Sequence, residues 1–246
     1  MNIYRMAETS TETGSARGCD FCALGPCVVC HGLPPAAATE LGHWSRAAVV
    51  EAGAEIPAGE PGEMQVLASG IARAELRLDA ERRQITRFRY AGDALQPAQV
   101  NGGGGPARIV AVTSCVLRRI PGEAFEDVGL RHPKVRERRL AVAVVEADHL
   151  ARHLAAVGRL TAAERLAMFL YDVARRTGRP TPVGGVAFRL PMTREDIADH
   201  LGLNVETVSR NLTRLKNAGL IQLPKPSIGV VPSMQALGAE MPFPPP

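Results

Sequence analysis

The sequence predicts an α+β protein with an N-terminal β-roll, a long central helix and a C-terminal winged helix-turn-helix. Three observations predict this order: glycine-broken strand patterns over about residues 47–120, one helical pattern from Lys134 to Val157, and two capped helices followed by a hairpin from Met192 to Val231. With 246 residues, of which 46% are hydrophobic and 22% charged, the chain can form two globular domains.

Composition and periodicity divide the chain into six segments. Its first residues are polar without a periodic pattern, and its last six read MPFPPP, so both ends are predicted to be disordered. The predicted segments are a disordered N-terminus (1–17), a cysteine-rich segment (18–35), a β-roll (36–130), a dimerisation helix (131–158), a winged helix-turn-helix domain (159–236) and a disordered tail (237–246).

The best strand pattern of the β-roll runs from Ile71 to Leu78, where apolar and polar residues alternate. Residues 79–81 are expected to turn the chain into a return strand from Gln84 to Tyr90, and the glycines at 102–105 predict a flexible loop. The predicted inward residues are Ala72, Ala74, Leu76 and Leu78, and the predicted outward residues are Arg73, Glu75 and Arg77.

The central helix carries apolar residues at alternating steps of four and three. A heptad seam of small residues favours close pairing with a second copy of the chain, and the alternative is a helix packed on its own domain. Gly158 is expected to end this helix, and Thr161 with Glu164 to begin the next one as a capping box. The predicted dimerisation residues are Leu140, Val144, Ala147, Ala151 and Leu154.

The stretch from Met192 to Leu223 reads as two helices joined by a tight turn. Thr193 and Asp196 form a capping box, Gly202 supplies the left-handed residue at the end of the first helix, and Asn204 caps the second helix. The second helix has an apolar stripe, which leaves its opposite face polar. Residues 221–231 can form a short wing hairpin.

The polar face of the second helix consists of Glu206, Ser209 and Arg210 near its N-terminus, where a recognition helix meets base edges. Arg can donate twice to guanine and Glu can accept from cytosine. An ordinary pair of surface helices is the alternative, but the turn, both caps and this polar face together favour binding of double-stranded DNA. Candidate phosphate contacts are Thr193, Arg194, Arg214 and Lys216, and further candidates are Arg175, Arg176 and Arg189.

Composition limits the partners and the location that the sequence allows. The net charge of +4 permits one, while an aromatic content of 4% argues against the stacking platforms of single-strand binders. No apolar run reaches the roughly 18 residues of a membrane helix, and the N-terminus has no signal-peptide core. We therefore expect a cytoplasmic protein without membrane contact, whose five cysteines are reduced.

This order of parts resembles the Crp/Fnr superfamily of bacterial transcription regulators, whose β-roll is of the cyclic-nucleotide-binding type. The likeness covers roughly Cys19 to Val231 and is strongest in residues 163–169 (AERLAMF) and 192–220. The run from Glu206 to Arg210 is similar to the Fnr branch, which reads a TTGAT–ATCAA palindrome. The resemblance implies that Glu206 and Arg210 contact a G·C pair, that Ser209 touches a thymine, and that a homodimer recruits RNA polymerase.

Four cysteines, Cys19, Cys22, Cys27 and Cys30, lie within twelve residues. Thiolates are the usual ligands of iron–sulfur clusters. Resemblance to the Fnr branch implies an oxygen-responsive [4Fe–4S] cluster with three N-terminal ligands and one from the β-roll. The ligands it implies are Cys19, Cys22, Cys30 and Cys115, with Cys27 as the alternative to Cys30 or Cys115.

Cys115 departs from the branch pattern, because it lies three residues before the ligand position, which Arg118 occupies. On a strand an odd shift reverses the face, unless a bulge restores it. If Cys115 points away, the four N-terminal thiols are left to hold the metal. Nitric oxide or another redox signal remains an alternative to oxygen.

Other functions fit the sequence less well. A zinc site would have to close two C-x-x-C pairs only four residues apart, and a metal-free thiol switch is a further alternative. Binding of a cyclic nucleotide lacks a well-placed arginine near Gly92-Asp93. An enzyme or electron carrier finds no support, since no phosphate loop, dinucleotide fingerprint or nucleophile–base pair is present.

Overall fold

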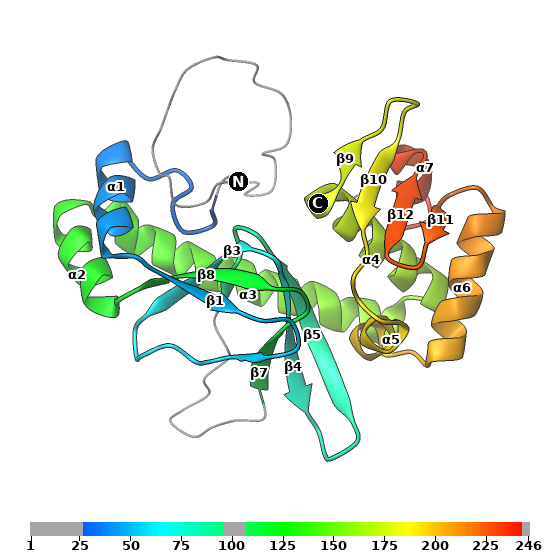
Figure 1. Ribbon diagram of the computed structural model, residues 1–246, viewed down its shortest axis with the longest axis horizontal. Coiled ribbons are helices and arrows are strands. Elements are labelled where there is room, and N and C mark those ends of the chain that lie inside the picture. Colours follow the sequence, from blue (N-terminus) through cyan, green and yellow to red (C-terminus); the bar gives the residue numbers. More distant parts are fainter. Residues whose placement is uncertain (1–26, 96–106, 243–246) are drawn as a thin grey trace.

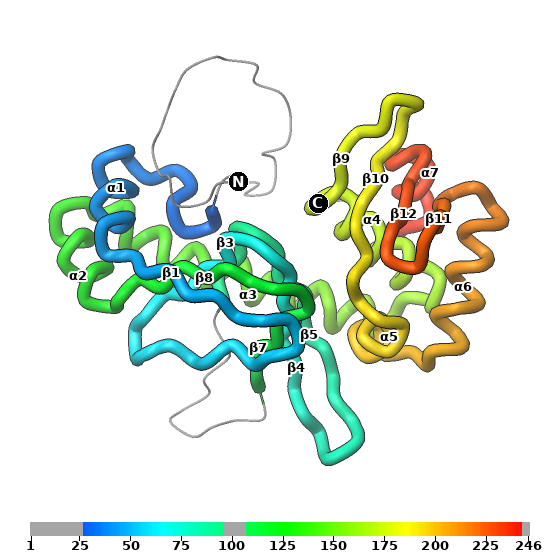
Figure 2. The backbone as a smooth tube through the Cα atoms, in the orientation of Figure 1, coloured from blue at the N-terminus to red at the C-terminus, as the bar shows by residue number. Residues whose placement is uncertain are grey.

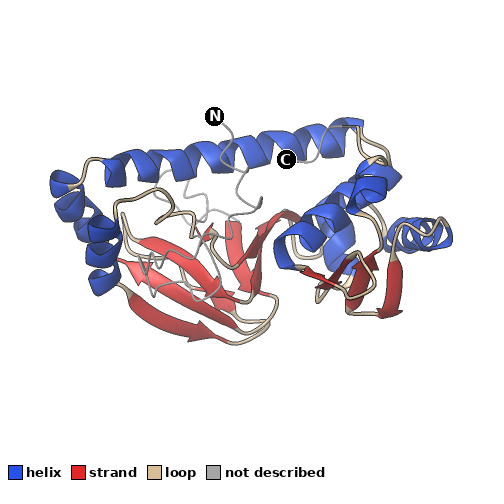
Figure 3. Cartoon of the chain, turned by 90° about the horizontal axis from the view of Figure 1, so that it is seen from above, coloured by secondary structure: helices blue, strands red, loops and turns tan. Residues whose placement is uncertain are grey.

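The computed structural model describes residues 27–95 and 107–242. In this part of the chain a β-roll and a C-terminal domain of helices and short strands lie side by side, and α3 (Lys134–Arg159) runs from one to the other (Figure 1). The backbone tube in Figure 2 leaves the β-roll through α2, follows α3 and enters the C-terminal domain at α4. Seen from above, α3 lies along one side of the strands of the β-roll (Figure 3). The predicted disordered residues 1–17, Cys19, Cys22 and the glycines at 102–105 lie outside the described residues.

Two antiparallel four-stranded sheets form the β-roll, in the orders β1-β8-β3-β6 and β2-β7-β4-β5. A core that includes Leu67, Ala72, Ile109 and Leu117 joins them. The strands are β1 (Arg46–Val50), β2 (Glu55–Ile56), β3 (Met64–Ser69), β4 (Ile71–Arg77), β5 (Arg83–Tyr90), β6 (Ala94–Leu95), β7 (Ala107–Ala111) and β8 (Cys115–Ile120).

The predicted hairpin of β4 and β5 is confirmed, but its faces differ from the alternation. Glu75 is 1% exposed although it was expected to face outward, and Leu78 is 62% exposed although it was expected to face inward. The pairing of β4 with β5 shifts register between Ala74 and Glu75, and the outer face of the hairpin is covered by the C-terminal domain. The C-terminal domain therefore helps to bury Glu75, whereas Leu78 is exposed because β4 ends one residue before it, at Arg77.

Helices cover the β-roll on one side and build the C-terminal domain. The predicted central helix is confirmed, but it runs through Gly158 to Arg159 rather than ending at the glycine. None of the helices in the described residues combines the length and apolar character of a membrane span. The other helices are α1 (Pro35–Trp44), α2 (Gly122–Arg131), α4 (Ala162–Thr177), α5 (Arg194–Leu201), α6 (Val205–Asn217) and α7 (Met234–Gly238).

The C-terminal domain is a winged helix-turn-helix, as predicted. Its sheet has the order β11-β12-β10-β9. The prediction of a disordered tail from residue 237 onward is wrong at its start. Leu237 lies in α7 and is fully buried in the core of this domain. Its strands are β9 (Arg179–Pro180), β10 (Val186–Arg189), β11 (Gln222–Lys225) and β12 (Ile228–Val231).

Candidate DNA-binding interface and cysteine segment

Local hydrogen bonds fix the turn between α5 and α6. The Thr193 hydroxyl accepts from the backbone N–H of Asp196 at 3.0 Å, and the Asp196 carboxylate accepts from that of Thr193 at 3.2 Å, which completes the predicted capping box. Gly202 ends α5 at φ 62°, and the Asn204 side chain accepts from the backbone N–H of Thr207 at 2.7 Å to begin α6. The predicted caps are therefore all present.

Helix α6 has one buried and one exposed face. Val208, Leu212 and Leu215 are buried in the domain core. Glu206, Ser209 and Arg210 are exposed on the first two turns of α6, and the Arg210 guanidinium donates to the Thr207 hydroxyl at 3.2 Å. The structure thus brings the three predicted base-reading side chains together on one accessible surface.

The predicted phosphate contacts differ in how accessible their side chains are. Thr193, Arg189 and Lys216 are exposed, Arg194 is half-buried, and Arg214 is exposed but pairs with Glu240 at 3.1 Å. Arg176 is a wrong prediction, because its side chain is only 16% exposed, pairs with Asp93 at 2.5 Å and stacks on the Tyr90 ring. Arg175 is half-buried and contacts Asp172 at 3.4 Å.

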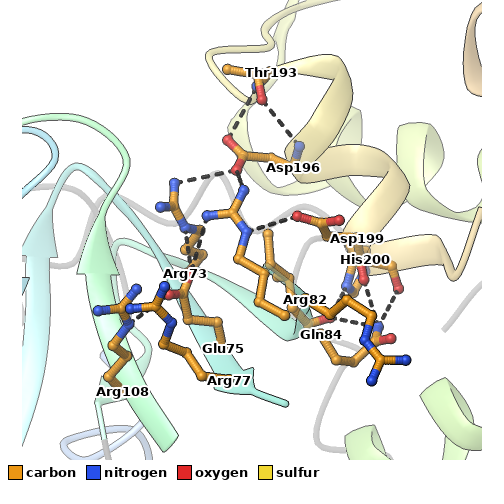
Figure 4. Close-up of polar contacts among 12 residues, drawn as sticks. Arg73, Glu75, Arg77, Arg82, Gln84, Arg108, Thr193, Asp196, Asp199 and His200 are labelled. Atoms are coloured by element: carbon orange, nitrogen blue, oxygen red, sulfur yellow. Dashed lines mark hydrogen bonds and ion pairs between the residues drawn. The ribbon is translucent and has the colours of Figure 1, made fainter. Parts of the chain in front are cut away.

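A cluster of charged residues holds α5 against the β4–β5 hairpin (Figure 4). Arg83 donates to Asp199 at 2.7 Å and to Asp196 at 2.8 Å, and Gln84 donates to the Asp199 carbonyl at 2.6 Å. Asp196 therefore both caps α5 and anchors it to the β-roll. We call this set the charged cluster; its members are Arg73, Glu75, Arg83, Arg108, Asp196 and Asp199.

Glu75 lies at the base of the charged cluster. Its carboxylate accepts from Arg73 at 2.8 Å, from Arg108 at 2.6 Å and from Arg83 at 3.3 Å. Burial by itself raises the pKa of Glu75. The hydrogen bonds and charges of Arg73 and Arg108 outweigh this effect, so the pKa lies below its usual value. Arg108 is thus committed to a carboxylate of its own chain.

His200 of α5 completes the contact between the domains. Its ring stacks on His153 of α3 with centroids 4.6 Å apart and meets Phe88 of β5 edge-on at 5.2 Å. Burial lowers the pKa of His200 to about 3, with a further lowering by His153. His200 is therefore neutral at pH 7.

Acidification is expected to weaken this contact. A histidine whose pKa is depressed in the folded chain makes its full contribution to the free energy of unfolding above its unfolded pKa of about 6.5. Below that pH the free energy of unfolding falls by up to about 1.4 kcal/mol per pH unit. Urea unfolding at pH 7.5 and pH 5 should show this loss, and a His200→Gln variant should lose less over the same interval. A His43→Gln variant, altered at an exposed site, is the control; equal losses in all three proteins would contradict the prediction.

A second contact between the domains runs through Asp93. Its carboxylate pairs with Arg176 of α4 and accepts from the backbone N–H of Tyr90 at 2.9 Å. Burial by itself raises the pKa of Asp93. The charges of Arg176 and Arg87 outweigh this effect, so the pKa lies below its usual value and the carboxylate is ionised. In the described residues the turn at Gly92-Asp93 thus contacts Arg176 of the C-terminal domain.

The predicted dimerisation residues form one exposed stripe on α3. Leu140 is 68%, Val144 57% and Leu154 75% exposed, and Ala147 and Ala151 are exposed between them. The opposite face of α3 contacts the β-roll, where Glu146 accepts from Arg87 and Arg89 at 2.6 Å each. We call the exposed residues the pairing stripe.

Two of the N-terminal cysteines lie in the described residues, in a turn of residues 27–32 that we call the cysteine turn. Cys27 is buried and Cys30 half-buried. The backbone N–H of Val29 donates to Cys27 Sγ at 3.4 Å, and that of Val28 donates to the Gly92 carbonyl at 2.9 Å. The turn therefore rests on the β-roll.

Cys115 lies elsewhere, fully buried with Leu67 and Leu117 between the two sheets, whereas Cys27 packs in a separate core with Met64 and Ile120. The thiol of Cys115 donates to the carbonyls of Thr113 and Ile71 at 3.2 and 3.4 Å, and burial raises the pKa of this thiol. Within residues 27–95 and 107–242, no three side chains of the metal-ligating types gather into a site. The structure does not bring Cys115 together with the cysteine turn.

Sequence reasoning missed the ion pairs that organise the domain contact. Arg83 and Asp93 pair with the C-terminal domain, Glu146 joins α3 to the β-roll, and Glu75 holds arginines of the β-roll itself. A charged residue within an alternating strand or helix reads as solvated. Only the clustering of arginines at 73, 77, 82, 83, 87 and 89 could have indicated that this hairpin needs buried carboxylate partners.

Known proteins resemble the chain over most of its length. The profile of a Crp-like helix-turn-helix domain matches residues 164–239. A probable transcriptional activator of Rhizobium leguminosarum bv. viciae is 31% identical over 230 residues, which are 92% of this chain and 94% of that protein. The nitrogen fixation regulation protein FixK of Azorhizobium caulinodans is 36% identical over 159 residues, 65% of this chain and 63% of FixK. The solved structure of FixK2 from Bradyrhizobium japonicum superposes with a TM-score of 0.71 at 26% identity, covering 81% of this chain and 98% of that chain.

Proposed function

Because the chain belongs to the Crp/Fnr superfamily of DNA-binding transcription regulators, we propose that it acts as a homodimer on a palindromic operator and responds to oxygen through a [4Fe–4S] cluster. The observation that carries the DNA-binding part is the exposed face of α6, with Glu206, Ser209 and Arg210 accessible together. A TTGAT–ATCAA palindrome suits this face. Once on DNA, the regulator would contact RNA polymerase.

The pairing stripe supports the dimer. Burying the exposed side chains of Leu140, Val144 and Leu154 against a second copy would remove apolar surface from water, and a two-fold dimer would place two recognition helices about 34 Å apart. Small residues at Ala147 and Ala151 would let the helices approach closely.

A Leu154→Glu variant is expected to remain folded as a monomer and to lose palindrome binding, because it places two like charges in the seam. Sedimentation velocity and gel shifts measure the two effects. Leu78→Glu is the matched control, since Leu78 is 62% exposed on the β4–β5 hairpin. A Leu154→Glu protein that still dimerises would refute the assignment of the seam.

The cysteine turn fits a thiolate-bound cluster better than Cys115 does. Ligands must be thiolates, and a backbone N–H donated to Cys27 Sγ stabilises negative charge on sulfur. Cys115 instead donates its S–H to two carbonyls in an apolar core. We therefore propose Cys19, Cys22, Cys27 and Cys30 as the ligands, in place of a set that includes Cys115.

When bound, such a cluster would supply an oxygen-labile link among its cysteines. The cysteine turn contacts both the β-roll and the N-terminal half of α3, because Cys27 and Val29 share a core with Val135 and Val142. A change in the turn would therefore reach the helix that carries the pairing stripe. A few kcal/mol of pairing energy is enough to switch operator occupancy.

The test is purification without oxygen, followed by visible and Mössbauer spectra with iron and sulfide counts. We expect a [4Fe–4S] signature, and a gel shift on the palindrome that is lost on exposure to air. A colourless protein with one zinc would refute the sensor and leave the DNA-binding function standing.

Single cysteine variants then assign the ligands. Each of the Ser variants at Cys19, Cys22, Cys27 and Cys30 is expected to lose the chromophore, whereas Cys115→Ser should keep it. Bleaching by Cys115→Ser would restore the β-roll cysteine as a ligand.

A further inference from the structure

The two faces of α3 have different partners. Its outward face is the pairing stripe, and its inward face buries Val135 and Val142 in the core that contains Cys27 and Val29. The helix expected to pair two subunits therefore carries the cysteine turn on its opposite side, near its N-terminal end.

Arg138 lies between those two buried valines on α3 and reaches into the cysteine turn. Its Nε donates to the Val28 carbonyl at 2.5 Å. The pKa of Arg138 lies below its ordinary value because the guanidinium is buried, and the neighbouring Cys27 and Cys30 would raise it once their thiols lose a proton. One side chain of α3 thus contacts the backbone between two cysteines.

Val28 is held from two sides. Its N–H donates to the Gly92 carbonyl of the β-roll, and its C=O accepts from Arg138 of α3. Val28 also lies between Cys27 and Cys30, so we expect a change in how these cysteines are bound to rotate the adjoining peptide groups. Such a rotation would break the hydrogen bond to α3 or carry the helix with it.

We propose that Arg138 is the positioning residue that couples the state of the cysteine turn to the pairing of α3. This inference rests on the proposed cluster and names the contact through which the cluster would control the dimer. A thiolate-bound cluster is anionic, so the guanidinium is held most firmly when the cluster is present.

The experiment measures dimer dissociation constants by analytical ultracentrifugation, with and without oxygen, alongside iron and sulfide content. Arg138→Met should keep the cluster and weaken the anaerobic dimer by about tenfold, toward the value of air-exposed wild type. Arg138→Lys keeps the charge and a donor and should recover most of the loss. Arg136→Met is the control, because Arg136 is exposed on the same helix and pairs only loosely, at 3.4 Å, with Glu126.

Two results would overturn the inference. One is an Arg138→Met protein with the wild-type ratio of anaerobic to aerobic dissociation constants. The other is loss of the cluster in both Arg138 variants, which would make Arg138 part of cluster binding rather than coupling. An iron-free wild-type protein, measured first, would instead refute the proposed sensor and remove the premise.

Discussion

Arg210→Ala is expected to weaken binding to the palindrome by at least about thirtyfold and to abolish the preference for the G·C pair. A bidentate contact between arginine and guanine contributes about 1–3 kcal/mol of discrimination. A dimer presents the recognition helix twice, so the two losses add to about 2–6 kcal/mol. Arg210 is exposed and touches only Thr207 of its own helix among the described contacts, so its removal should leave the fold intact.

Fluorescence anisotropy at fixed salt, with the palindrome and with a scrambled version of it, measures this effect. Lys216→Ala is the matched control: as a phosphate contact it should weaken both DNAs alike and reduce the salt dependence by about one unit per subunit. If Arg210→Ala weakened the two DNAs equally, Arg210 would be a phosphate contact and α6 would read sequence through other side chains.

Features that depend on a few neighbouring residues could be predicted from the sequence. The caps at Thr161, Thr193 and Asn204 and the left-handed Gly202 are set by hydrogen bonds within four residues of each other, and all four are present. Periodicity likewise located the central helix and the β4–β5 hairpin. The DNA-binding face followed because α6 buries a continuous apolar stripe and leaves its other side to solvent.

Features that depend on contacts between distant segments could not be predicted. Alternation assigns a strand residue to a face but does not tell what covers that face, so Glu75 was placed wrongly, and Leu78 was placed wrongly because the strand ends before it. Arg176 was read as solvated because nothing nearby in sequence shows its partner, Asp93. Strand parity did predict that Cys115 and Arg118 face opposite sides, which matches a fully buried Cys115 and a half-buried Arg118.

The buried carboxylate of Glu75 gives the largest expected effect on stability. Glu75→Gln removes the negative charge that faces Arg73, Arg83 and Arg108 and turns an amide N–H₂ toward one of them. Breaking one side of a buried ion pair costs about 3–5 kcal/mol. Because Arg73 and Arg83 also bind Asp196, the loss should loosen α5 from the hairpin as well as destabilise the β-roll.

Urea unfolding at pH 7 measures this loss, and Glu81→Gln, at the exposed tip of the same hairpin, is the control, with an expected change within about 0.5 kcal/mol. The deficit should also depend on pH. The pKa of Glu75 is lowered in the folded chain, so its contribution is complete above the unfolded value of about 4.3 and is lost as the pH falls through the lower folded value. Wild type and Glu75→Gln should therefore converge in acid, and a deficit that stayed constant from pH 7 to pH 3 would show that packing, rather than charge, makes Glu75 necessary.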